Sequence, residues 1–182
     1  LACEVKEFEW VLNFVQTEKA NLAPANRQNA FNYCTAFVLV ETGNLRKALR
    51  TLQAVAFTDM HYNLNSRALL ARIFTEQEDW ELLLAHVGTF RAYLKRETTL
   101  AHYVAHGYRQ LLKHLKHLAQ GMLDTHHQDS KARQQIRDNL HAKVNAATKF
   151  PYHEWLLHYL GPSAKLHQQP NAQANHKPQP SH

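Results

Sequence analysis

Histidine is the residue whose number and spacing in this chain first suggest chemistry. The 182 residues include 14 histidines. His102 and His106 are four residues apart, so a helix would place both imidazoles on one face, where they could bind zinc. The same holds for His114 and His117, which are three residues apart. Two ligands do not complete a zinc site, and no Asp or Glu lies between residues 102 and 117. We therefore predict no metal-binding residue.

The segment "HEWLLH" at residues 153–158 is close to the zinc-protease pattern HExxH, in which two histidines one helical turn apart bind the metal. Its second histidine comes five residues after the first, about 140° around a helix, so the two rings do not face one metal ion. Other enzyme patterns, such as GxSxG or a glycine-rich phosphate loop, do not occur. Cys3 and Cys34 lack a metal-ligand spacing and are too few for a disulfide framework. We predict no catalytic residue, no bound cofactor and a protein that is not an enzyme.

Positive charge is concentrated in one region of the chain. Residues 1–90 contain 8 Lys and Arg against 10 Asp and Glu, whereas residues 91–149 contain 11 against 4, together with seven histidines. A region with this charge could bind nucleic acid, an anionic protein or a membrane surface. Most charged helix faces are simply solvated, however, and this one lacks a pattern of aromatic residues interleaved with arginine, on which single-strand-binding proteins stack bases.

The basic residues of this region fall on one side of a predicted helix. An apolar seam runs from Val104 to Met122 at alternating spacings of four and three residues. About 200° around the helix from this seam lie five basic or histidine residues. These are His102, His106, Arg109, Lys113 and Lys116. Because the seam must pack against the rest of the protein, this face should point to solvent, and the helix is not a membrane insert.

The elements that position these residues are predicted to be helices throughout. The chain has 5 Gly and 6 Pro, with four of the prolines after residue 160, which leaves few turns for an all-β fold. Gly43 is expected to end one helix and Asn44 to cap the next, while residues 58–63 are expected to form a polar linker. The helices are predicted, from apolar spacings of three and four, at residues 3–19, 24–43, 44–57, 64–74, 80–94, 98–120, 130–148 and in a short segment after residue 151.

Two of the predicted hairpins repeat each other at an offset of 35 residues. Ala36 and Ala71 take equivalent positions in the first helices. In the second helices, residues 48–52 and 83–87 take equivalent positions, with a small or apolar residue at each end. This pattern resembles the tetratricopeptide repeat, a helical hairpin of 34 residues with small and large residues at these positions.

The sequence departs from the tetratricopeptide pattern at some positions, and a second resemblance covers more of the chain. Asn32 and Arg67 stand where the tetratricopeptide pattern has Trp, and no Pro closes either copy. Residues 5–120 also resemble the C-terminal helical region of uncharacterised bacterial proteins, through the stretches "FTDMHYNLNSRALLARIF" and "TFRAYLKR". The resemblance implies an all-α protein in which antiparallel helical hairpins stack as a short tetratricopeptide-like solenoid, with the long helix as a cap. It implies no particular activity.

Stacked helical hairpins generally present a concave surface to a protein or peptide. By this analogy the first hypothesis is a non-enzymatic scaffold or adaptor domain for protein-protein interaction. The residues expected to face the partner, if they are neither core nor simply solvated, are Tyr33, Phe37, Asn65, Arg72 and Glu76. The alternative is a basic helical module that binds nucleic acid through the face around residues 102–116.

Residues 1–160 are predicted to form the helical domain. Residues 161–182 are rich in Pro, Gln, Asn and His and are expected to be disordered, because they cannot bury enough apolar area to offset chain ordering. No apolar run approaches the roughly 18 to 20 residues that cross a bilayer, and no signal peptide is recognisable, so we expect a cytoplasmic protein. The chain starts at Leu1, so upstream repeats in a longer protein are compatible with it.

Overall fold

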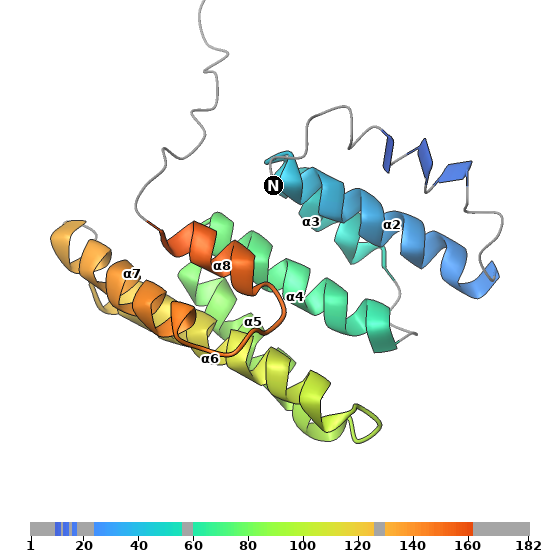
Figure 1. The fold of residues 1–182 in the computed structure, drawn as a ribbon. Coiled ribbons are helices and arrows are strands. Elements are labelled where there is room, and N and C mark those ends of the chain that lie inside the picture. Colours follow the sequence, from blue (N-terminus) through green and yellow to red (C-terminus); the bar gives the residue numbers. More distant parts are fainter. Residues whose placement is uncertain are drawn as a thin grey trace, which may run out of the picture.

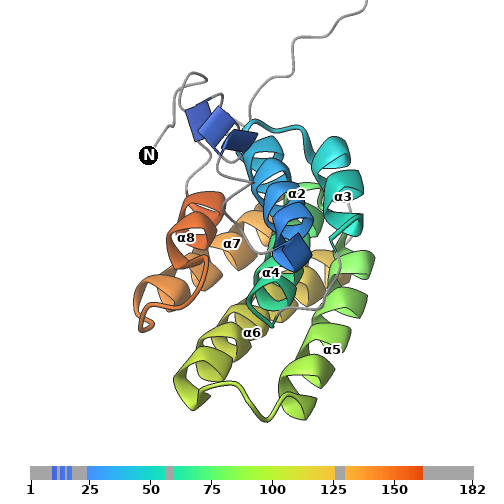
Figure 2. The same cartoon turned by 90° about the vertical axis from the view of Figure 1, so that its right-hand side faces the viewer.

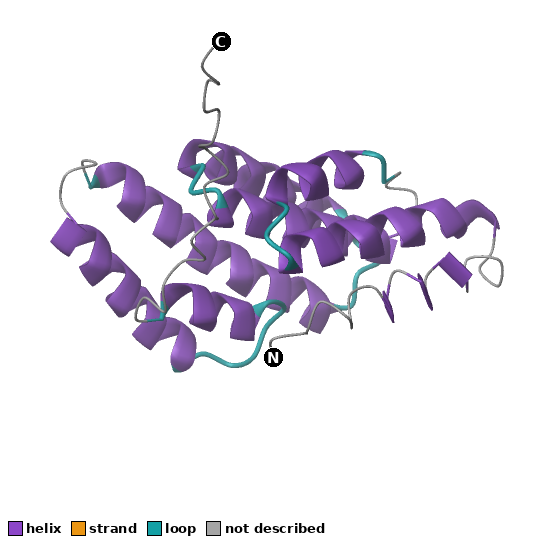
Figure 3. Cartoon of the chain, turned by 90° about the horizontal axis from the view of Figure 1, so that it is seen from above, coloured by secondary structure: helices purple, strands orange, loops and turns teal. Residues whose placement is uncertain are grey.

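The computed structural model describes residues 24–55, 60–125 and 130–161, together with six separate residues between 10 and 17. Within these ranges the chain forms helices and no strand, which confirms the all-α prediction (Figure 3). Of the helix expected over residues 3–19, only these six residues are described, and all six are helical. The tail expected over residues 161–182 lies outside the described residues except for residue 161. The described helices are α2 (Pro24–Glu41), α3 (Leu45–Gln53), α4 (Met60–Glu76), α5 (Trp80–Arg96), α6 (His102–Asp124), α7 (Ser130–Asn145) and α8 (His153–Leu160).

Consecutive helices pack side by side. Helices α2 and α3 contact each other and α4, and α4 also contacts α5 and α6. Helix α6 packs against α5 on one side and α7 on the other, and α8 packs on α7. In Figure 1 the pair α2 and α3 lies above α4, whereas α5 and α6 lie below it; Figure 2 shows the same order from the side.

Small side chains at the helix contacts let the backbones approach closely. Ala36 of α2 and Ala71 of α4 are both 0% exposed. One cluster of buried apolar residues joins α2, α3 and α4, and a larger one extends from α4 to α8. Leu49 and Leu70 pack against both clusters, so the core is continuous along the row of helices.

The turn that closes each first helix has the same geometry in both hairpins. Gly43 after α2 has a φ of 76°, and Glu78 after α4 has a φ of 55°, both in the left-handed region. The N–H of Asn44 donates to the carbonyl of Leu39 at 2.7 Å, and 35 residues later the N–H of Asp79 donates to the carbonyl of Phe74 at 3.0 Å. A hydrogen bond from the N–H of the sixth residue back to the carbonyl of the first is typical of the Schellman motif, in which a left-handed residue ends the helix.

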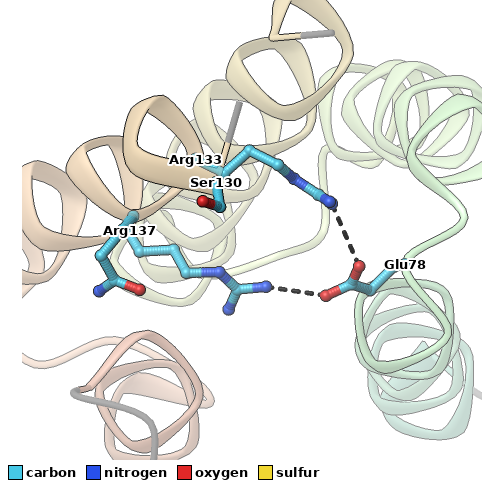
Figure 4. A pocket seen from close by; sticks show the side chains of 5 residues that line it. Glu78, Ser130, Arg133 and Arg137 are labelled. Atoms are coloured by element: carbon cyan, nitrogen blue, oxygen red, sulfur yellow. Dashed lines mark hydrogen bonds and ion pairs between the residues drawn. The ribbon is translucent and has the colours of Figure 1, made fainter. Parts of the chain in front are cut away.

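Glu78 adopts the left-handed conformation without being glycine, and its side chain has a structural use. Its carboxylate binds Arg133 at 3.2 Å and Arg137 at 2.8 Å, both from α7 (Figure 4). A left-handed conformation costs a residue with a Cβ roughly 1 to 2 kcal/mol. The ion pairs connect the α4–α5 turn to α7, which is 55 to 59 residues away in the sequence.

Three local predictions differ from the structure. The polar segment 58–63 was expected to be a linker, but α4 already begins at Met60, and Asn63 is buried with its side-chain oxygen bonded to Arg67 four residues later. The side chain of Asn63 thus forms its hydrogen bond within its own helix and does not interrupt that helix. The side chain of Asn44 does not cap α3, because its amide bonds back to Thr42. Helix α6 spans residues 102–124 instead of 98–120.

We expect Glu78→Gly to unfold at a higher urea concentration than Glu78→Ala. Both variants lose the ion pairs to α7, but only alanine keeps a Cβ in the left-handed conformation, so the free energies of unfolding should differ by about 1 kcal/mol. Gly43→Ala is the matched control, because it introduces the same strain at the equivalent turn without removing an ion pair. Equal stability of the two Glu78 variants would show that the turn is not strained.

Candidate functional site

Most residues expected to face a partner in the concave groove contact other parts of the chain. Arg72 of α4 is only 9% exposed, and its guanidinium pairs with Glu41 of α2 and with Glu76. Trp155 of α8 donates from its indole nitrogen to the same Glu76 carboxylate at 2.8 Å, and the Arg72 guanidinium lies 5.5 Å from the centre of a Trp155 ring. Tyr33 interacts with the hydroxyl of Tyr152, directly before α8. Helix α8 and the residue before it therefore cover this surface.

The other two residues of that set differ from each other. The side-chain oxygen of Asn65 accepts a hydrogen bond of 2.9 Å from the hydroxyl of Tyr108 in α6, so Asn65 ties α4 to α6. Phe37 on α2 is 37% exposed. Phe37 is the only exposed residue of the five, and the structure does not gather the five into one open site.

A different surface is hollowed and strongly basic. It is a groove of about 1120 Å³ with α6 as its floor and residues of α5 and of the α7 region as its sides. Its lining contains six Lys and Arg residues and no Asp or Glu among the described residues. We refer to it as the basic groove. The six cationic residues are Arg91 and Lys95 from α5, Arg109, Lys113 and Lys116 from α6, and Lys143 from α7.

The face predicted on α6 contributes to the basic groove in part. Arg109, Lys113 and Lys116 line the groove, and the first two are exposed. His102 and His106 do not line it; they are exposed on the first two turns of the same helix, with their ring centres 6.3 Å apart.

The cations that α5 and α7 add to the groove were not predicted from the sequence. Arg91 and Lys95 are four residues apart, which puts them on one face of α5, and that spacing was the available signal. Lys143 gives no such signal, because its position beside α6 depends on how α7 packs. Tyr103, which is 79% exposed at the start of α6, was missed as well, because an aromatic residue in an amphipathic helix is usually buried.

His114 is a buried polar group at the floor of the basic groove. It is 8% exposed, and its Nε2 atom has no hydrogen-bond partner among the described residues. Its ring stacks on Phe150 with 5.3 Å between ring centres. Burial and then the positive charges of Lys113, His117, His153 and Lys143 hold the pKa of His114 below its usual value. A negatively charged ligand in the groove would raise the pKa of His114 and so oppose the effect of these positive charges.

A second, smaller pocket of about 180 Å³ lies where α7 meets the α4–α5 turn. Figure 4 shows Arg133 and Arg137 reaching from α7 toward Glu78, with Ser130 beside them. Both arginines are already paired with the Glu78 carboxylate. This pocket therefore contains one carboxylate for its two arginines, whereas no described carboxylate lines the basic groove.

The histidines do not gather into a metal centre in the part of the chain that the structure describes. No group of three or more His, Cys, Asp or Glu side chains there is arranged to hold a metal ion. Among the described helices, none has an apolar stretch long enough to span a bilayer. The chain matches no protein-family model, and no curated protein and no solved structure is significantly similar to it.

The lowered pKa of His114 predicts that stability falls as the pH drops. In the unfolded chain the imidazole takes up a proton near pH 6.5, whereas in the folded protein it does so only at lower pH. The free energy of unfolding should therefore decrease between pH 7.5 and pH 5.5. Urea titrations at both pH values would measure the loss, which should be smaller in His114→Gln. A loss in His114→Gln as large as that of the wild type would contradict the assignment.

Proposed function

We propose that this chain is a non-enzymatic binding module that holds the phosphate backbone of a nucleic acid in the basic groove. The observation that carries the proposal is the convergence of six Lys and Arg residues from three helices on one groove of about 1120 Å³, without a carboxylate among its described lining residues. This choice gives the alternative hypothesis from the sequence more weight than a protein scaffold that binds through Tyr33, Arg72 and Glu76, because those residues already contact α2, α8 or the residue before α8.

The spacing of the cations suits a repeating anion. Arg91 and Lys95 on α5 are four residues apart, as are Arg109 and Lys113 on α6, which corresponds to about 6 Å along each helix. Like charges this close repel one another, and no described carboxylate neutralises them in the fold. A phosphate backbone supplies a regular row of negative charges and releases its condensed counterions when it meets such a surface, which favours binding.

We further propose that the helices form a short tetratricopeptide-like stack. Two features support this architecture: the left-handed turn recurs after 35 residues, and Ala36 and Ala71 are both buried between helices. The basic groove would then lie at the end of the stack formed by α5, α6 and α7, where the long helix stands in place of a further hairpin.

The test is a triple substitution in the groove, Lys95→Gln with Lys113→Gln and Lys143→Gln, one from each of its three helices. If six cations contact a single strand, the slope of log K against log salt should be about −4, and the triple variant should reduce it to about −2. Affinity for a 20-nucleotide strand at 50 mM salt should fall at least tenfold. Fluorescence anisotropy between 50 and 200 mM salt measures both quantities.

A matched control removes the same charge elsewhere. Arg46, Lys47 and Arg50 are all exposed on α3, and their triple glutamine variant should bind as the wild type does. Equal losses in the two triple variants would show general charge attraction and overturn the proposal. Binding of poly-glutamate but not of DNA or RNA, lost in the groove variant, would instead identify an acidic protein segment as the partner.

A further inference from the structure

Tyr103 is an aromatic side chain that the fold leaves in solvent. It is 79% exposed, the highest value among the large hydrophobic residues that the structure describes as exposed. No ring pair, hydrogen bond or ion pair joins its side chain to another described residue. It belongs to neither cluster of buried apolar residues. Packing therefore does not explain the aromatic ring at this position.

The position of Tyr103 is set by the same helix face that forms the floor of the basic groove. Seven residues make almost two helical turns, so residues seven apart lie nearly in line, about 10 Å from each other along the axis. One such line on α6 runs through Tyr103, Gln110 and His117, and the last two line the groove. Tyr103 thus stands just beyond the groove on the continuation of its floor.

Two histidines lie beside Tyr103 on the first turns of α6. His102 begins a line that continues through Arg109 and Lys116 of the groove, and His106 begins one that continues through Lys113 and Gln120. At about 100° per residue, both imidazoles point to the same side of the Tyr103 ring. An extended chain that leaves the groove toward the start of α6 would pass over this group of three exposed rings.

We propose that the bound nucleic acid is single-stranded and that one of its bases stacks on the ring of Tyr103 while its backbone lies in the basic groove. This inference depends on the function proposed above. A single strand has bases that are free to turn toward an aromatic surface, whereas a duplex keeps its base faces inside the stack. The six groove cations attract phosphates of either form, so the exposed ring is what distinguishes them.

The test compares Tyr103→Ala with the wild type on three ligands. These are a 20-nucleotide mixed-sequence DNA strand, an abasic strand with the same number of phosphates, and the 20-base-pair duplex. Tyr103→Ala should weaken binding of the base-bearing strand about fivefold to a hundredfold, because stacking on an aromatic residue contributes by that amount. Binding of the abasic strand and of the duplex should not change, and Tyr103→Phe should restore the affinity of the wild type.

The control for loss of an exposed aromatic residue is Phe37→Ala on α2, which should leave all three affinities unchanged. Circular dichroism should match the wild type for both variants, and the urea midpoint of Tyr103→Ala should match it as well, because Tyr103 is 79% exposed. The stacking inference would be overturned if Tyr103→Ala bound the base-bearing strand as tightly as the wild type does, or if it lost as much affinity for the abasic strand. If the triple groove variant nevertheless bound more weakly than the wild type, the proposed function would stand. Absence of binding of any strand to the wild type would overturn both proposals.

Discussion

The burial of one face of α6 is the constraint on which the fold and the basic groove both depend. Leu111, Leu115 and Leu118 are 0% exposed between the neighbouring helices. Burying such a side chain contributes about 1.5 to 3 kcal/mol, so together these contacts fix the rotation of the helix about its axis. Once that rotation is fixed, Arg109 and Lys113 must lie on the solvent side. Apolar packing, and not attraction between charged groups, therefore places the cations side by side.

The surface on which a helical stack would receive a partner is used within this chain. Arg72 is held by carboxylates from two helices, and the indole of Trp155 completes the arrangement from α8. Tyr159 of α8 adds a hydrogen bond of 3.1 Å to the carbonyl of Thr75. The two carboxylates keep the buried arginine paired, without which it would be strongly destabilising. The hydrogen bonds of Trp155 and Tyr159 to α4 hold α8 in place. Recognition of another molecule is therefore better supported at a surface that lacks internal partners.

The sequence allowed prediction of what lies within one helix and not of what several helices bring together. The periodicity of α6 predicted that Arg109, Lys113 and Lys116 share a face, because their spacing is a property of that helix alone. It could not show that Arg91 and Lys143 approach them, since this depends on how α5 and α7 pack. The docking of Trp155 on Glu76, which are 79 residues apart, was beyond prediction for the same reason. Likewise, glycine marks the end of α2, whereas Glu78 adopts the same left-handed geometry with a residue that does not favour it.

The distribution of the carboxylates explains why the basic groove keeps its charge. Glu41 and Glu76 pair with Arg72, and Glu78 pairs with two arginines of α7. Contacts of these acids join helices that are distant in the sequence, and their ion pairs involve three arginines outside the groove. None of these three carboxylates lines the basic groove. The groove is left with a positive field that the described part of the chain does not neutralise, and an external polyanion is the partner that such a field attracts most strongly.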